Sequence, residues 1–379
     1  MKFSCLQENL KQGLSIVSHL TTKNINFPIL NNVLIKIEDK LIKLITTNLE
    51  VAINVNIRGK AEKDGDFTVP AKLFYDYVAL LPPNERVDLE VKGSLIEIKS
   101  GSYDTKIKGQ PATEFPLLPQ LKKELTYAVR GRDFKKALEQ VLFSVASNEI
   151  RPEISGVLFN FGKSEPYELT VVGTDSYRLS EKKLPFTLKN DALADNSHKN
   201  FIVPLKTLIE VNHILSVFSA AGDDALEISV LENQVLFSYD SVELIAKLIE
   251  GQYPNYQQVI PETFQTKGIF NKDELAKTIK ATSLFATGLN DVYLKVSPPE
   301  GIITVSSVNS QTGEQKADVK GEIQGIPNEV TVNYKYLLDF FNSIDATEVE
   351  FKMIDAFNPC VLIPKDSKDF LYVVMPIKR

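Results

Sequence analysis

Three segments of the sequence share one pattern, and this repetition restricts the fold more than any other feature. Each segment has a Thr-Val or Ile-Val pair, then Pro or Asn, one further residue, a lysine and an apolar helical pattern. The segments are TVPAKLFYDYVALL (68–81), IVPLKTLIEVNHIL (202–215) and TVNYKYLLDFFNSI (331–344), with Lys72, Lys206 and Lys335 at the same position. Because a proline in the first turn of a helix loses no hydrogen bond, Pro70 and Pro204 predict that a helix begins there.

A second helix is predicted upstream of each of these segments. The sequences ENLKQGLSIVSHL, RDFKKALEQVLFSV and KDELAKTIKATSLF align with Leu10, Phe134 and Leu275 in register. Apolar residues follow at i+4 and often at i+7 or i+8, which places them on one face of a helix. Each repeat therefore contributes two amphipathic helices.

Strand-like segments lie between the two helices, and Asn48, Asp175 and Asn309 stand at the same position after one of these strands. Turn-rich segments, EFPLLP (114–119) and QYPNYQQVIP (252–261), close the first two repeats. Chance similarity of amphipathic helices is the alternative, but the order of elements and the aligned lysines both oppose it. The sequence thus predicts three copies of one α+β domain, at 1–122, 123–262 and 263–379, each with two helices packed on antiparallel sheets.

Composition limits where such a chain works. The formal net charge of −6 argues against a uniformly basic nucleic-acid binder but allows one positive surface. No apolar run is long enough to span a membrane, and MKFSCLQENLKQ lacks the apolar core of a signal peptide. Cys5 and Cys360 are the two cysteines, so neither a disulfide framework nor a cysteine-based zinc site is expected. We expect a cytoplasmic protein.

The motifs of common enzyme classes are absent from the sequence. It contains no GxxxxGK[ST] phosphate loop, no GxSxG nucleophile elbow and no HExxH motif, so we expect no cofactor and no metal. The stretch GTDSYRLS (173–180) leaves two interpretations open. Asp175 and Arg178 could serve a hydrolase or transferase, or the stretch could border a docking place. For the chain as a whole, a multidomain scaffold that does not surround its partner is a further possibility.

The repeated lysines suggest an anionic partner, because a cation in the first turn of a helix slightly opposes the helix dipole and yet recurs in every repeat. Tandem domains also leave unpaired strand edges at the two ends of the chain. A head-to-tail contact would pair those edges and close into a ring. Basic helices inside such a ring would reconcile a DNA partner with the negative net charge.

Several short motifs match one family in their order along the whole chain. They are FPIL (27–30), TVPAK (68–72), TDSYRL (174–179), YPNY (253–256) and YVVMPIKR (372–379). With these motifs the chain resembles the bacterial sliding clamp, the beta subunit of DNA polymerase III. TDSYRL combined with the VMP tail is specific, whereas neither would be alone.

The resemblance implies three clamp domains in tandem and a head-to-tail ring. Members of the family are homodimers that surround double-stranded DNA without reading its sequence, and they are not enzymes. We therefore expect a ring-shaped homodimer that tethers the catalytic subunit of DNA polymerase III for processive synthesis. The clamp loader and other proteins with a clamp-binding motif are further implied partners. Few phosphate contacts would give weak, salt-sensitive binding that permits sliding.

The resemblance also implies a peptide-binding pocket between the second and third domains. The deeper part matches Ile154, Thr174, Ser176, Tyr177, Arg178, Leu179, Pro254, Val259, Val373 and Met375, and the shallower part matches Arg151, Glu153, Phe357, Pro359, Pro376 and Ile377. Tyr177, Glu153 and Gln258 depart from residues found in the family, which leaves the preferred peptide open. The alternative for Leu179, Val259 and Met375 is that they are plain core.

Implied DNA contacts are Lys23, Asn24, Lys72, Asn148, Arg151 and Lys206. Implied dimer contacts are Ile107 in the first domain and Leu284 or Phe285 in the third. Within GTDSYRLS, we expect Asp175 to fix the turn, as Asp side chains often do. Arg178 and Leu179 would then line the docking site.

Overall fold

The computed structural model describes residues 1–21, 26–116, 125–148, 150–162, 166–189, 200–218, 224–231 and 233–378. One order of elements occurs three times along the chain: a strand, a helix, a group of strands, a second helix and three further strands. This order confirms the predicted α+β fold of three repeats. Within the described ranges, no helix is both long and apolar enough to cross a membrane.

The strands follow the same order in each repeat. The first repeat contributes β1 (Lys2–Leu6), β2 (Asn32–Glu38), β3 (Leu41–Thr47), β4 (Val51–Ile57), β5 (Gly59–Lys63), β6 (Gly65–Pro70), β7 (Arg86–Lys92), β8 (Leu95–Ser100) and β9 (Tyr103–Lys108). The second contributes β10 (Leu125–Arg130), β11 (Gly156–Phe161), β12 (Glu168–Thr174), β13 (Arg178–Pro185), β14 (Thr187–Leu188), β15 (Asn200–Pro204), β16 (Ala225–Leu231), β17 (Gln234–Tyr239) and β18 (Val242–Lys247). The third contributes β19 (Thr266–Asn271), β20 (Asp291–Ser297), β21 (Ile302–Asn309), β22 (Gly313–Gly325), β23 (Asn328–Asn333), β24 (Glu348–Met353), β25 (Cys360–Pro364) and β26 (Phe370–Val374).

Both helices of every repeat form where the sequence predicts them. The first helices are α1 (Gln7–His19), α3 (Gly131–Val141) and α5 (Lys272–Thr282), and the second helices are α2 (Ala71–Leu80), α4 (Leu205–Val217) and α6 (Tyr334–Asn342). Leu10, Phe134 and Leu275 are each the fourth residue of a first helix, and each is buried. The predicted register of the first helices is therefore confirmed.

The second helices begin one residue later than expected from their prolines. Pro70 and Pro204 are the last residues of β6 and β15, because the extended ladder continues up to each proline. Asn333 precedes α6 at the corresponding place, and its side chain accepts the N–H of Lys335 at 2.9 Å. The repeated lysines are the second residues of their helices and are exposed: Lys72, Lys206 and Lys335.

The chain divides into two compact units, and the second repeat contributes to both. The first unit comprises Met1–Lys135, Phe186–Ser197 and Lys206–Leu248, and the second comprises Lys136–Pro185, His198–Leu205 and Ile249–Arg379. In each unit one antiparallel sheet runs from one repeat into the next.

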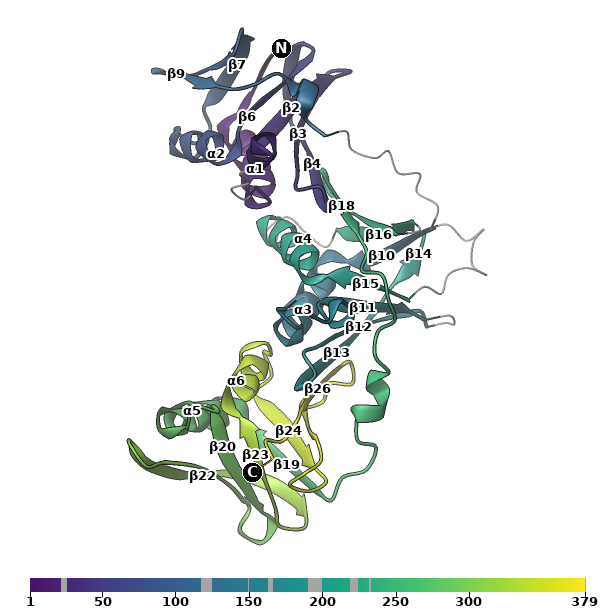
Figure 1. Cartoon of the computed structure of the whole chain (residues 1–379), viewed down its shortest axis with the longest axis vertical. Helices are drawn as coiled ribbons and strands as arrows, with labels where there is room; N and C mark the ends of the chain where they lie inside the picture. The colour runs from purple at the N-terminus through teal and green to yellow at the C-terminus, as the bar shows by residue number, and fades with distance from the viewer. Residues whose placement is uncertain are drawn as a thin grey trace. The chain divides into compact units, whose positions relative to one another are not determined.

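The first unit contains two antiparallel sheets. One has the strand order β5-β1-β7-β8-β9, and the other has the order β14-β10-β16-β17-β18-β4-β3-β2-β6. In the second sheet, β18 of the second repeat pairs with β4 of the first repeat. Helix α1 packs on β3 and β4 and against α2, which lies over β2 and β6, as Figure 1 shows.

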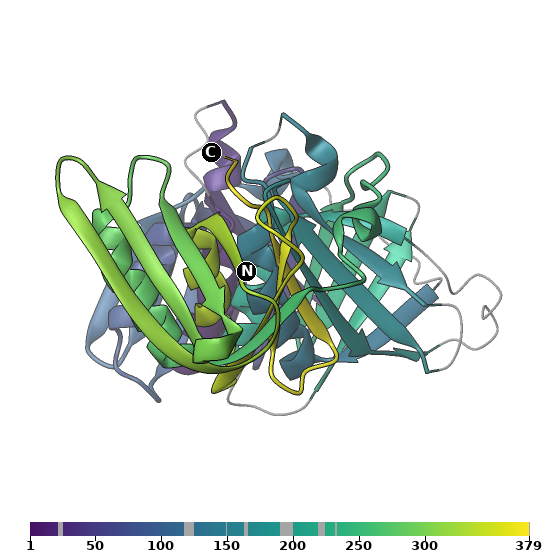
Figure 2. The ribbon, with the colours of Figure 1, turned by 90° about the horizontal axis from the view of Figure 1, so that it is seen from below.

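The second unit contains a sheet with the order β15-β11-β12-β13-β26-β25-β24-β19-β22-β21-β20-β23. Its strand β26, from the carboxyl end of the chain, pairs with β13 of the second repeat. In Figure 2 the yellow terminal strand accordingly runs beside teal strands of the second repeat. The core under α5 and α6 includes Phe270, Leu275, Phe340 and Tyr372.

Both cysteine thiols should resist modification in the native chain. Cys5 and Cys360 are free and buried, and burial raises the pKa of each thiol to about 12. At pH 8 only about one thiol in ten thousand would be ionised, so Ellman's reagent should detect almost none until guanidinium unfolds the chain. Rapid reaction of the native protein would contradict this packing.

Candidate functional site

The TDSYRL segment forms a tight turn between β12 and β13. The Thr174 hydroxyl donates to the carbonyl of Arg178 at 2.7 Å and accepts the N–H of Ser176 at 3.1 Å. Oδ1 of Asp175 accepts the N–H groups of Tyr177 and Arg178 at 2.9 and 3.0 Å. These bonds confirm that Asp175 fixes the turn.

The same turn occurs in the first repeat, between β3 and β4. Oδ1 of Asn48 accepts the N–H of Val51 at 2.8 Å. Leu49 has a φ of 76°, the same as Ser176, which stands at this position in the second repeat. In the third repeat, Oδ1 of Asn309 accepts a backbone N–H at 2.9 Å. A side-chain contact of this kind is therefore a property of the repeat, although the turn in the third repeat is one residue longer. What distinguishes the second copy is the carboxylate of Asp175.

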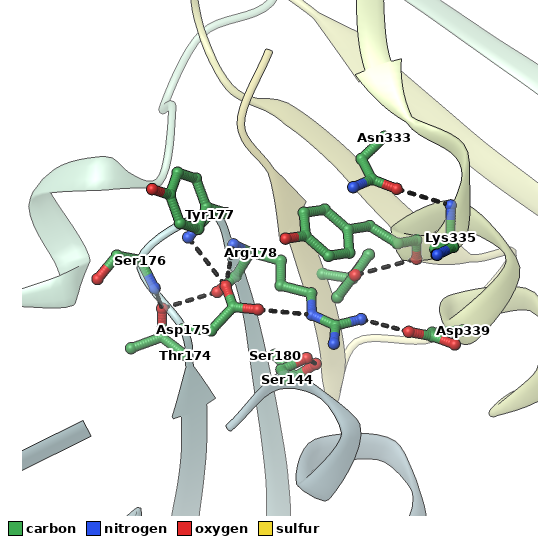
Figure 3. Close-up of polar contacts among 12 residues, drawn as sticks. Ser144, Thr174, Asp175, Ser176, Tyr177, Arg178, Ser180, Asn333, Lys335 and Asp339 are labelled. Atoms are coloured by element: carbon green, nitrogen blue, oxygen red, sulfur yellow. Dashed lines mark hydrogen bonds and ion pairs between the residues drawn. The ribbon is translucent and has the colours of Figure 1, made fainter. Parts of the chain in front are cut away.

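The second carboxylate oxygen of Asp175, Oδ2, is available to Arg178 because Oδ1 holds the turn. Nε of Arg178 donates to Oδ2 of Asp175 at 3.0 Å, and Nη1 donates to Asp339 on α6, as Figure 3 shows. The guanidinium carbon lies 4.4 Å from the ring centre of Tyr336 and 5.5 Å from that of Phe143, distances at which a cation is attracted by an aromatic face. The Arg178 side chain is only 13% exposed.

Burial and neighbouring groups act on the Arg178 cation in opposite directions. Removal from water disfavours the charged form, but Tyr372, Asp339 and Asp175 outweigh this cost and raise the pKa of the guanidinium. Burial also raises the pKa of the Tyr372 phenol, whose hydroxyl donates to the carbonyl of Tyr336 at 3.0 Å. Arg178 is thus a fixed cation that joins β13 to α6.

Next to Arg178 the surface is hollowed into a pocket of about 190 Å³. Its floor is Leu179 and Val373, which stand opposite each other on β13 and β26 and are 3% and 1% exposed. Both belong to an apolar cluster with Tyr253 and Tyr256. The full lining is Arg151, Ile154, Thr174, Ser176, Arg178, Leu179, Pro254, Asn255, Tyr256, Val259, Val373 and Met375.

Hydrogen bonds hold the walls of the pocket. The N–H of Met375 donates to the carbonyl of Tyr177 at 2.9 Å, so the segment after β26 is attached to the turn. On the rim, Arg151 donates to Glu153 at 3.0 Å and to the Ser176 hydroxyl at 3.1 Å. The pocket therefore combines an apolar floor with a polar rim that carries a positive charge.

The structure brings together most of the residues predicted for the deeper part of the pocket. Of that part only Tyr177 does not line the hollow; its side chain is 65% exposed. In the shallower set, Arg151 lines the pocket and the remaining members do not: Glu153, Phe357, Pro359, Pro376 and Ile377. Their role stays a prediction.

Asn255 and Tyr256 also line the pocket, although they are not among the residues predicted for it. Both belong to the motif YPNY, of which only Pro254 is a predicted pocket residue. Tyr256 is 9% exposed and packs edge-to-face on Tyr253, with ring centres 6.5 Å apart. From sequence alone, an aromatic residue such as Tyr256 is not distinguishable from an ordinary core residue.

The residues predicted for DNA are exposed where the structure describes them: Lys72, Asn148, Arg151 and Lys206. Lys23 and Asn24 lie outside the described residues. Among the predicted dimer contacts, Leu284 is 76% exposed and Phe285 is partly buried. The Ile107 side chain, in contrast, is 4% exposed and belongs to the core, because it points inward from β9; only the backbone of its strand is at an edge.

Comparison with known families covers almost the whole chain. Models of the DNA polymerase III beta subunit match with the N-terminal domain at residues 1–119, the central domain at 128–255 and the C-terminal domain at 257–378. The chain belongs to the DNA polymerase III beta subunit family. Its function is that of a DNA sliding clamp, which makes DNA polymerase III processive.

Individual relatives of the clamp family resemble the chain over its full length. A beta sliding clamp of Staphylococcus epidermidis is 29% identical over 97% of this chain and 96% of its own, and one of Synechococcus elongatus is 26% identical over 100% and 99%. The crystal structure of a Thermotoga maritima DNA polymerase III beta subunit has a TM-score of 0.91 and 25% identity, over 100% of this chain and 99% of its own. A Bacillus subtilis sliding clamp has a TM-score of 0.90, 25% identity and the same coverage.

The attachment of Arg178 to α6 should stabilise the second unit. Asp339→Asn removes one of the two carboxylates on the largely buried guanidinium, and because Asp339 itself is 40% exposed, we expect a cost of about 1–2 kcal/mol. Circular dichroism should show a lower midpoint of thermal unfolding.

Asp345→Asn is the matched control for this variant. Asp345 follows α6 and pairs with Lys136 at 2.9 Å, but its side chain is 89% exposed, so its loss should cost about 0–1 kcal/mol. Equal unfolding midpoints for the two variants would contradict the role given to Arg178.

Proposed function

We propose that two copies of this clamp close head to tail into a ring around double-stranded DNA, and that the pocket holds peptide segments of its partners. The observation that carries the proposal is the three-domain family match along the whole chain. The partners are the catalytic subunit of DNA polymerase III, the clamp loader and other proteins with a clamp-binding motif. The domains end near residues 122 and 262, and the protein works in the cytoplasm.

Open strand edges support the head-to-tail contact. Strand β9 is the outer strand of its sheet, and residues 313–320 of β22 pair with β21 on one side, while β19 pairs only with the later part of β22. Leu284, which lies in the 3-10 turn Ser283–Phe285 that contacts β22, is 76% exposed. A second copy would cover both the edges and this side chain.

Repeated cations support a nonspecific contact with DNA. Lys72, Lys206 and Lys335 stand exposed at the start of corresponding helices. Contacts with phosphates position a protein on the duplex but do not read its sequence. A small number of such contacts gives weak, salt-dependent binding, and enclosure by the ring then replaces affinity as the means of retention.

The pocket supports docking of short apolar motifs. Burial of two or three apolar side chains at ~1.5–3 kcal/mol each, reduced by the cost of ordering the peptide, gives an affinity on the order of micromolar. Binding of that strength lets one partner replace another.

A hydrolase or transferase that uses Asp175 and Arg178 is disfavoured by their bonding. Both oxygens of Asp175 are engaged, by two backbone N–H groups and by Arg178. Arg178 is itself held between two carboxylates and two aromatic rings. Their geometry serves the turn and the attachment of α6, so we propose a function without catalysis.

Retention on circular DNA tests the ring. After loading onto nicked circular DNA with a clamp loader, the protein should elute with the DNA during gel filtration, and cutting the circle should release it. Equal retention on circular and linear DNA would contradict enclosure and favour a scaffold that does not encircle DNA.

Met375→Ala should weaken peptide binding by about tenfold, because it removes an apolar wall of the pocket. The probe is a fluorescent peptide with the clamp-binding segment of the polymerase III catalytic subunit, and the measurement is fluorescence anisotropy. Leu41→Ala is the control, since Leu41 is 53% exposed on β3 and does not line this pocket. Unchanged affinity in Met375→Ala would place the peptide elsewhere.

A further inference from the structure

The two strand joints between repeats share one register. Strand β4 begins with Val51, which stands opposite Ala246, the fifth residue of β18. Strand β13 begins with Arg178, which stands opposite Val374, the fifth residue of β26. In both joints, the first residue of the strand after the Asx turn is therefore opposite the fifth residue of the last strand of the next repeat.

Two further strands correspond to the strands of these joints: β22 in the third repeat and β9 in the first repeat. Strand β22 follows the Asn309 turn and begins with Gly313, so it corresponds to β4 and β13. Strand β9 is the last strand of the first repeat, as β18 and β26 are of theirs, and its fifth residue is Ile107. Both strands have an open side.

The register of the two existing joints therefore predicts the third, between two copies of the chain. With Ile107 opposite Gly313, Lys106 stands opposite Glu314, and Asp104 stands opposite Lys316. All four of these charged side chains are exposed in the single chain, and they alternate with more buried neighbours on their strands. Opposite residues of an antiparallel pair point to the same face, so each acid would meet a base.

Neighbouring registers are less favourable than the inferred one. A slip by two residues in one direction puts Asp104 opposite Glu314, and a slip in the other direction puts Lys106 opposite Lys316. A slip by one residue turns the outward side chains of one strand against the inward side chains of the other. Among registers within two residues of it, the inferred register is therefore the one that fits the charge order on the two edges.

The predicted pairs also extend pairs that already exist in the first unit. Asp104 lies 3.5 Å from Lys99, and Lys106 lies 3.1 Å from Glu97, both across the β8·β9 ladder. Addition of β22 from a second copy would continue each row with alternating sign. Strand addition to an open sheet edge uses backbone hydrogen bonds for affinity and side chains for specificity.

The inward face fits the same register. Gly313 has a φ of 107° and no side chain, and a Cβ built at this position would lie 3.8 Å from the ring of Phe285. Ile107 of one copy would therefore lie next to Phe285 of the other. Both residues are dimer contacts implied by the family resemblance.

We infer that the pairs Asp104–Lys316 and Lys106–Glu314 select a second copy of this chain as the partner of β9 and β22 and fix Ile107 opposite Gly313. This inference rests on the proposed head-to-tail dimer. It adds the residues that decide which chains and which register are accepted.

The test mixes two single variants, Lys106→Glu and Glu314→Lys. A homodimer of either variant has like charges at both joints, whereas the mixed dimer restores an opposite-charge pair at both. Native mass spectrometry of an equal mixture, after exchange of subunits, should show a ratio of mixed dimer to homodimers at least about threefold above its statistical value of about one. Each variant alone should have a dimer dissociation constant about tenfold higher than that of the original chain.

A matched control uses Lys108→Glu mixed with Asp318→Lys. These residues are exposed on the same two strands, but the inferred register does not place them opposite each other, so their mixture should remain statistical. Statistical mixing of Lys106→Glu with Glu314→Lys, in a chain that dimerises, would overturn the register and leave the proposed ring intact. An original chain that stays monomeric at every concentration would overturn both.

Discussion

Backbone pairing between β13 and β26 is the interaction on which the pocket beside Arg178 depends. It places Leu179 opposite Val373 and lets the second and third repeats share one continuous sheet. The turn before β13 and the segment after β26 are brought together at the end of the same ladder, where Met375 bonds to Tyr177. The pocket is therefore formed by the end of a joint between repeats.

One backbone design supports different side-chain chemistry in different repeats. Asn48 and Asp175 hold their turns through the same Oδ1 contacts, but only the carboxylate has a second charged oxygen for Arg178. Arg178 also donates to Asp339 on α6. An aspartate instead of an asparagine at the turn therefore helps to hold the arginine that connects the second repeat to a helix of the third. Specialisation of the second repeat needs no change in the fold.

Much of the fold could be predicted from sequence because its signals are local and repeated. The helix register at Leu10, Phe134 and Leu275 follows from a spacing of three to four residues, and the Asx turn follows from residue type. Asp339 gave no such signal, since its contact with Arg178 joins positions 161 apart and its own helix pattern is ordinary. The inward direction of Ile107 depends on the pairing of its strand, which residue spacing alone does not fix.

The location of the pocket within one chain has a consequence for the working cycle of the clamp. All of its lining residues come from the second unit of one chain. Its floor is held by the pairing of β13 with β26, which is internal to that chain. A ring of two copies would offer two docking places, and neither would depend on whether the ring is closed. With the proposed peptide in the pocket, a partner would keep its hold while the ring opens, and attachment to the clamp would be mechanically separate from the passage of DNA into it.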